Sequence, residues 1–330
     1  MISIARQSQD VMPPLIRKLV ARDLVDAKNL DAVCWADLMQ RSYGVRKSLP
    51  PRTDENILAF LHTDPEGAFV AEDERAGIVG SCFSHVWGNT GWVGPLSVLP
   101  AYQARGIGKD LLKASLSYLE DRGCTDIGLE TMPDNATNLG MYLKVGLRPE
   151  GLVLVLSKSL EDASLGEEPA GKMTVERLSE SDSKANLVRQ IKGISGALRF
   201  GLDYTAEIEL VERFSLGDTV VASSDGKVVG FSIMHTKPRR ENQSVAGARV
   251  LAVHPEVREG VIGPLVATAE LMAADARCSE MTIPVPAVSR RALDAVLSRG
   301  YAVSRSFERL MWTGSSGMNE EACNLCSWSG

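Results

Sequence analysis

The chain has 330 residues, which suits about two domains of ordinary size, and 44% of its residues are hydrophobic. Its formal net charge of −6 at pH 7 gives no electrostatic footprint for nucleic acid or an anionic membrane, so we expect neither as a partner. The sequence also lacks the roughly 18 consecutive apolar residues of a membrane span and the pattern of a signal peptide, which predicts a cytoplasmic protein.

The chain begins with a segment that carries no strand or helix pattern. Residues 1–14 are predicted to be a leader, because Pro13-Pro14 fits neither a sheet interior nor a helix. An apolar run predicts a strand over residues 15–20, and Asp23 is a candidate N-cap for a helix that runs towards Gly44. The first folded unit therefore starts near residue 15.

The next elements lead from a second helix into a sheet. Thr53 or Asp54 is predicted to cap a short helix. Residues 68–72 and 77–84 have the alternation of a hairpin around a charged turn, and residues 92–98 are typical of a mostly buried strand. This order of elements, with the helices and strands that follow up to residue 160, predicts an α+β domain with a mixed sheet.

A loop joins the strand that ends at Val98 to an amphipathic helix. Its sequence over residues 98–109 is VLPAYQARGIGK, and Leu111, Leu112, Leu116 and Leu119 then share one helical face. Unpaired N–H groups converge at a helix N-terminus, and Gly106 and Gly108 let a diphosphate approach the backbone. The spacing fits neither the triphosphatase loop nor G-x-G-x-x-G. The loop is predicted to bind an anion.

A second motif follows at residues 135–147, with the sequence NATNLGMYLKVGL. Together the two stretches resemble the GCN5-related N-acetyltransferase (GNAT) superfamily, which has Q/R-x-x-G-x-G/A after a strand and then N-x-x-A-x-x-x-Y-x-x-x-G-F. The second stretch matches in Asn135, Tyr142 and Gly146, and it departs in Asn138 and Leu147. The resemblance implies acetyl-CoA as co-substrate, no metal, and transfer of the acetyl group to a primary amine by direct attack.

The resemblance also implies roles for individual residues. The backbone N–H groups of the loop would hold the diphosphate, Gln103 would brace the loop, and Val98 would pair with the pantetheine arm. The residues so assigned to acetyl-CoA are Val98, Gln103, Arg105, Gly106, Ile107, Gly108, Lys109 and Asn135. Two alternatives stay open: Arg105 and Lys109 as plain surface residues, and Asn135 as a simple helix cap.

Proton transfer is expected to involve Tyr142 and Glu130. Tyr142 would act as general acid towards the departing CoA thiolate, since a phenol with an ordinary pKa near 10 is protonated at neutral pH. In the superfamily, the strand before the loop diverges from the next strand and leaves a gap for the pantetheine arm. By resemblance, Glu130 lies on that next strand and is the candidate general base, with Asp134 and Glu72 as weaker candidates. The alternative for Glu130 is a solvated carboxylate at a strand edge.

The strand pattern repeats about 150 residues later. Residues 161–172 are polar and acidic and are the predicted linker, so we expect a catalytic domain over 15–160, a second domain over 173–314 and a tail over 315–330. The expected fold is therefore α+β, with two tandem GNAT-like domains, each a mixed and mostly antiparallel sheet flanked by helices.

The second half departs from the sequence pattern of the loop at residues 98–109. In one register Val261 replaces Gly106 and Pro264 removes an N–H from the turn. In the other, residues 261–267 form a strand, as in one group of tandem acetyltransferases that also has a Val-Pro strand and a closing Arg-Met-Tyr-x-Gly segment. Both registers stay open, and both leave Val296 where the first half has Tyr142. The second half is predicted to have lost the reaction and to shape the acceptor site.

Six cysteines are scattered through the chain, which is typical of reduced thiols. Cys323 and Cys326 form a single C-x-x-C pair without a nearby histidine, so no metal site is expected.

The acceptor is predicted to be a small-molecule or peptide amine, and the sequence carries no signal for an oligomeric state. Two other functions remain as alternatives: a non-catalytic acyl-CoA-binding regulatory or interaction protein, and a transferase for longer acyl groups.

Overall fold

A computed structural model describes residues 12–161, 173–257, 260–318 and 323–326. The first half contains six strands, four α-helices and two short 3-10 helices. In chain order they are β1 (Leu15–Lys18), η1 (Ala21–Asp23), α1 (Leu24–Tyr43), α2 (Asp54–Thr63), β2 (Phe69–Asp73), β3 (Gly77–Trp87), β4 (Thr90–Val98), η2 (Pro100–Tyr102), α3 (Ile107–Asp121), β5 (Asp126–Thr131), α4 (Ala136–Val145) and β6 (Arg148–Ser159).

The second half repeats most of this order and adds a short last strand. Its elements are β7 (Met173–Arg177), η3 (Leu178–Glu180), α5 (Lys184–Leu198), α6 (Thr205–Arg213), β8 (Gly217–Ser224), β9 (Lys227–His235), β10 (Val245–Val253), α7 (Ile262–Asp275), β11 (Glu280–Pro286), α8 (Arg290–Leu297), β12 (Ala302–Thr313) and β13 (Asn324–Cys326). The α+β fold class, with a mixed and mostly antiparallel sheet flanked by helices, is confirmed.

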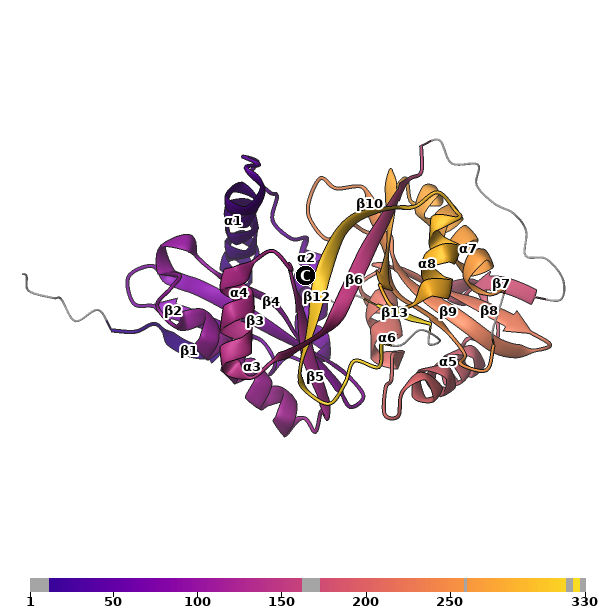
Figure 1. Ribbon diagram of the computed structural model, residues 1–330, viewed down its shortest axis with the longest axis horizontal. Helices are drawn as coiled ribbons and strands as arrows, with labels where there is room; N and C mark the ends of the chain where they lie inside the picture. Colours follow the sequence, from indigo (N-terminus) through magenta and orange to yellow (C-terminus); the bar gives the residue numbers. More distant parts are fainter. Residues whose placement is uncertain (1–11, 162–172, 258–259, 319–322, 327–330) are drawn as a thin grey trace, which may run out of the picture.

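One continuous sheet joins the two halves, and each half gives its last long strand to the other (Figure 1). The strand order is β1-β2-β3-β4-β5-β12-β6-β11-β10-β9-β8-β7, and β13 pairs with β10. Strand β12 therefore lies between β5 and β6, and β6 lies between β12 and β11. Because of this exchange, residues near 310 border on the strand that carries Glu130.

Local sequence signals account for the ends of several helices. The Thr53 side chain accepts a hydrogen bond from Asn56 N at 3.3 Å and so caps α2. Helix α1 begins after Asp23, but the Asp23 side chain makes no capping bond and instead accepts hydrogen bonds from Arg17. The helix ends at Gly44, which has a left-handed φ of 69° that glycine adopts without strain. The apolar face of α3 is buried in one core cluster with β3, β4 and β5.

One of the two registers considered for the second half is wrong. Residues 262–275 form helix α7, and the preceding strand β10 ends at Val253, so residues 261–267 are not a strand. The segment is apolar around most of its circumference, since Leu265, Val266 and Ala269 are all buried. A short apolar run of this kind does not distinguish a strand from a buried helix.

Two predicted segments fall largely on residues that the structure does not describe. Most of the leader (1–11) and of the linker (162–172) lies outside the described ranges. No helix in the described part of the chain is long and apolar enough to cross a membrane.

Candidate functional site

The site is built around a gap between two parallel strands. Strands β4 and β5 are paired from Thr90 with Asp126 to Val93 with Leu129, and the pairing stops there. Two residues after Val93, β4 contains Pro95, which has no N–H to donate to a neighbouring strand. Residues 94–98 and 129–132 then line opposite sides of a pocket of about 610 Å³. The expected divergence of the two strands is present.

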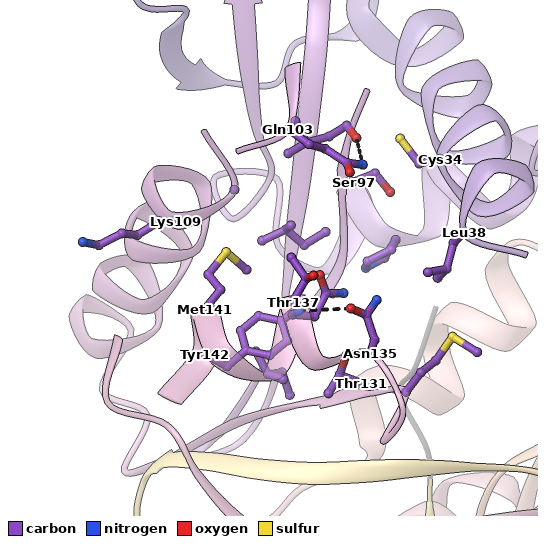
Figure 2. A pocket seen from close by; sticks show the side chains of 18 of the residues that line it. Cys34, Leu38, Ser97, Gln103, Lys109, Thr131, Asn135, Thr137, Met141 and Tyr142 are labelled. Atoms are coloured by element: carbon purple, nitrogen blue, oxygen red, sulfur yellow. Dashed lines mark hydrogen bonds between the residues drawn. The ribbon is translucent and has the colours of Figure 1, made fainter. Parts of the chain in front are cut away.

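The glycine loop closes one end of this pocket. Gly106 is the N-cap of α3 and has a φ of 89°, and the pocket is lined by Gly106, Ile107 and Gly108 at the first turn of the helix. Gln103 donates from Nε2 to the carbonyl oxygen of Val98 at 2.9 Å, which holds the loop against the end of β4 (Figure 2). The pocket therefore ends at a helix N-terminus, where an anion is stabilised.

The two basic residues of the loop lie further out. Arg105 is exposed, donates from Nη2 to Ala101 O at 2.8 Å, and lies over the ring of Tyr102 at 4.8 Å. Lys109 borders the pocket, and its side chain extends away from the other labelled residues (Figure 2). Their contact with a bound diphosphate stays a prediction.

Asn135 serves as a helix cap and also borders the pocket. Its Oδ1 accepts a hydrogen bond from Asn138 N at 3.1 Å, which begins α4 (Figure 2). The cap uses the oxygen and leaves the amide NH₂ group as a donor of the same side chain. The capping alternative is therefore observed, and it does not conflict with a role in binding.

Tyr142 lies in the wall of the pocket, on α4 (Figure 2). Only 6% of its surface is exposed. Burial raises the pKa of its phenol above the ordinary value, the nearby Cys82 thiol acts in the same direction, and a hydrogen bond with Thr131 opposes both. The phenol is therefore protonated at neutral pH and can donate a proton.

Glu130 is buried and paired, so the alternative of a solvated strand-edge carboxylate is wrong. Strand β12 covers β5, and Arg309 stands directly opposite Glu130 in the register. Nη2 and Nε of Arg309 lie 2.6 and 3.1 Å from Oε1 of Glu130, and both side chains are almost fully buried. Use of Glu130 as a proton acceptor stays a prediction, and the carboxylate would first have to leave this guanidinium.

The corresponding gap in the second half is filled by the chain itself. Strand β10 pairs with β11 only from Val245 to Gly247, and β13 pairs with the next part of β10, from Val250 to Ala252. Leu325 of β13 is fully buried there. The second-half helix α7 begins after Val261 in place of Gly106, and Val296 is buried on α8. Among the described residues, the gap that stays open between two strands is the one between β4 and β5 in the first half.

The structure also shows where two second-half features lie that the sequence did not place. Phe307 of β12 lines the pocket, although it belongs to the second half. The C-x-x-C pair belongs to the β13 segment, with both thiols free, and no potential metal-binding cluster occurs among the described residues. Neither position has a local sequence signal, because both depend on where a distant strand pairs.

Comparisons with known proteins point to one family. Residues 32–147 match the Acetyltransferase (GNAT) family. N-alpha-acetyltransferase 30 of Schizosaccharomyces pombe is 34% identical over 92 residues, which are 26% of this chain and 61% of that protein. Acetyltransferase YE1169 of Yersinia enterocolitica is 30% identical over 102 residues, 31% of this chain and 72% of that protein. The chain thus spans less than two thirds of the first of these relatives.

Two solved structures share the fold over most of the chain. The GCN5-related N-acetyltransferase from Sphaerobacter thermophilus superposes with a TM-score of 0.65 at 14% identity and covers 92% of this chain and 97% of its own. A tandem GNAT protein from the clavulanic acid biosynthesis pathway superposes with a TM-score of 0.56, also at 14% identity, and covers 88% and 98%. At these identities the likeness describes the fold alone.

Proposed function

The chain belongs to the GNAT acetyltransferase family, and from this premise we propose that it transfers an acetyl group from acetyl-CoA to a primary amine. The observation that carries the proposal is the open gap between β4 and β5, which ends at the N-terminus of α3. A pocket of about 610 Å³ with an anion-binding end suits a long co-substrate with a diphosphate.

The residues around the gap fit the parts of acetyl-CoA. Gly106, Ile107 and Gly108 lie at the first turn of α3 and border the pocket, so their N–H groups would hold the diphosphate. The strand edges at 94–98 and 130–131 would bond the pantetheine arm. Acetyl-CoA supplies an activated acyl thioester with a thiolate leaving group. Tyr142 holds a proton on its phenol at this place and can give it to a departing thiolate.

The second half is proposed to shape the acceptor site rather than to bind a second co-substrate. Strand β10 of the second half corresponds to β4 of the first half. Strand β13 pairs with the part of β10 that corresponds to the unpaired part of β4. Phe307 of β12, which belongs to the second half, forms part of the pocket wall. The acceptor itself is proposed to be a small-molecule or peptide amine, and the name of the S. pombe relative favours including peptide N-termini among the candidates.

Calorimetric titration with acetyl-CoA, followed by an assay of amine-dependent CoA release, tests the proposal. We expect one site per chain and CoA release that depends on an added amine. Two sites per chain would contradict the assignment of the second half. Binding without CoA release for any amine would favour the alternative of an acyl-CoA-binding regulatory protein, and no binding would contradict both.

A further inference from the structure

Helix α1 forms one wall of the pocket. Four of its residues border the pocket with the spacing of a single helical face, namely Cys34, Trp35, Leu38 and Arg41. Asp31 lies one turn earlier on the same face, since it precedes Trp35 by four residues. A group that holds the Asp31 side chain therefore also holds this wall of the pocket.

The α1 wall and helix α3 lie on opposite faces of the sheet. Along β2, Val70 packs in one core cluster with α1, and the next residue, Ala71, packs in another cluster with α3 and with Tyr142 of α4. Neighbouring residues of a strand point to opposite faces, so α1 covers one face and α3 covers the other. Figure 2 shows Cys34 and Leu38 across the pocket from Tyr142. The proposed function places acetyl-CoA against α3 and Tyr142, which leaves the α1 side for the amine.

Two arginines hold Asp31. Its Oδ2 accepts a hydrogen bond from Nε of Arg52 at 3.0 Å and another from Nη2 of Arg240 at 2.6 Å. All three side chains are exposed by 10% or less. Arg52 belongs to the connection between α1 and α2, whereas Arg240 belongs to the connection between β9 and β10 and is 209 residues from Asp31 in the sequence. The second half thus reaches the helix of the pocket wall through Arg240.

Backbone pairing fixes Arg240 against the first half. Arg52 and Arg240 form an isolated antiparallel β-bridge, and Glu241 N donates to Pro51 O at 3.0 Å. Nη1 of Arg240 also donates to Pro50 O at 3.1 Å. The guanidinium therefore has partners both in α1 and in the connection that follows it. A charged group with such hydrogen bonds away from water holds its geometry, because leaving it would deprive buried charges of their partners.

An exposed ion pair of the same segment provides a matched control. Lys237, three residues before Arg240, pairs with Glu55 of α2 at 3.4 Å, and these two side chains are 44% and 45% exposed. Exposed ion pairs contribute little to the stability of a contact. The buried contact of Arg240 with Asp31 is therefore the stronger of these two links between the second half and the helices of the first.

Resting on the proposed acetyl transfer, we propose that Arg240 is a positioning residue for the amine acceptor. Through Asp31 it sets where the α1 wall stands relative to the gap between β4 and β5, and so the second half controls the acceptor side of a first-half pocket. This role is separate from that of Phe307, which lines the pocket itself. The amine must meet the thioester at a fixed distance, and a displacement of about 1 Å is enough to impair that approach.

Kinetics of CoA release and calorimetric binding of acetyl-CoA in Arg240→Met test the proposal. Asp31 keeps Arg52 as a partner in this variant, so we expect the fold to persist. The amine is one that supports CoA release by the wild type, starting with glucosamine and L-phenylalanine amide. KM for the amine should rise about 10-fold or more, while the Kd of acetyl-CoA should change by less than about 2-fold. Arg240→Lys keeps a charge beside Asp31 and should restore part of the amine KM, and Lys237→Gln should behave as the wild type.

An unchanged amine KM in Arg240→Met would overturn the inference and leave the proposed function intact. Equal losses in amine KM and in acetyl-CoA affinity would also overturn it, because they would indicate general damage to the fold. If Arg240→Met does not fold, Asp31→Asn, which keeps the shape of the side chain, carries the same prediction.

If no amine releases CoA, the proposed function fails, and hydrogen exchange then decides on the contact alone. Backbone amides of residues 31–41 should exchange about 10-fold faster in Arg240→Met than in the wild type, while those of α3 should not change. Equal exchange of the α1 amides in the two proteins would refute the contact.

Discussion

Arg309 of β12 donates two hydrogen bonds to Glu130 of β5, although 179 residues separate them in the sequence. Nη2 of Arg309 also donates to Cys326 O at 2.6 Å, and its guanidinium lies 5.2 Å from the Trp92 ring centre. One buried side chain thus connects the strand beside the pocket, the exchanged strand β12 and the strand β13 that fills the second-half gap.

The first prediction concerns this pair. Arg309→Met removes the guanidinium that pairs with the buried Glu130 carboxylate, so the free energy of unfolding should fall by about 3–5 kcal/mol in urea denaturation. The double variant Arg309→Met/Glu130→Met should recover most of this loss, since it removes both charges. The control is Arg75→Met, at an exposed residue of the turn between β2 and β3, and it should change stability little. A single variant as stable as the wild type would show that the pair is not needed.

The two glycines of the loop should respond differently to alanine. Gly106 has a φ of 89°, so Gly106→Ala forces a left-handed conformation and should weaken acetyl-CoA binding about 10-fold. At Gly108 a Cβ would meet Met141, Leu96 and Val98 only at ordinary distances of 3.5–3.7 Å. Gly108→Ala should therefore bind nearly as the wild type in calorimetry. Equal losses in both variants would argue against backbone strain as the cause.

Tyr142→Phe should lower kcat by about 100-fold with little change in acetyl-CoA affinity, as expected for loss of a general acid. Because the pKa of Tyr142 is raised above its ordinary value, the wild-type rate should not fall between pH 7 and 9 through loss of this proton. Tyr118→Phe removes a hydroxyl that donates to Asp64 at 3.1 Å, away from the pocket, and is the control. An unchanged kcat in Tyr142→Phe would remove the residue from the catalytic assignment.

Stability should fall as the pH decreases from about 6.5 towards 4. Burial lowers the pKa of His235 from 6.5 to about 4, so in this window the unfolded chain binds a proton that the folded chain does not. The difference amounts to about 3 kcal/mol once the unfolded histidine is fully protonated. His235→Gln should flatten this part of the curve of unfolding free energy against pH, and the exposed His62→Gln should not.

Below pH 4.5 a second group should continue the loss. Burial would raise the pKa of Glu207, but the hydrogen bond with His235 and the charge of Arg249 bring it from 4.5 down to about 2. A carboxylate whose pKa is lowered by folding stabilises the folded state at a pH above its pKa in the unfolded chain. This stabilisation is lost as the pH falls towards its pKa in the folded chain. His235 and Glu207 are in contact, so their titrations are coupled. A pH curve in His235→Gln identical to that of the wild type would contradict this account.

The sequence by itself determined the features that depend on neighbouring residues. Local preferences account for three such features: the end of α1 at Gly44, the cap of α2 at Thr53 and the turn at Gly106. The glycine loop and the Asn135 helix together also indicated the family, because each motif is local and their order along the chain is fixed.

Only the tertiary structure decided which strands lie side by side. An alternating strand pattern shows which residues share a face, but it does not show which edge the strand pairs with. The exchange of β6 and β12 therefore could not be predicted, nor could the pairing of β13 with β10. Those long-range pairings place Arg309 against Glu130, and they place Phe307 in the wall of the pocket between β4 and β5.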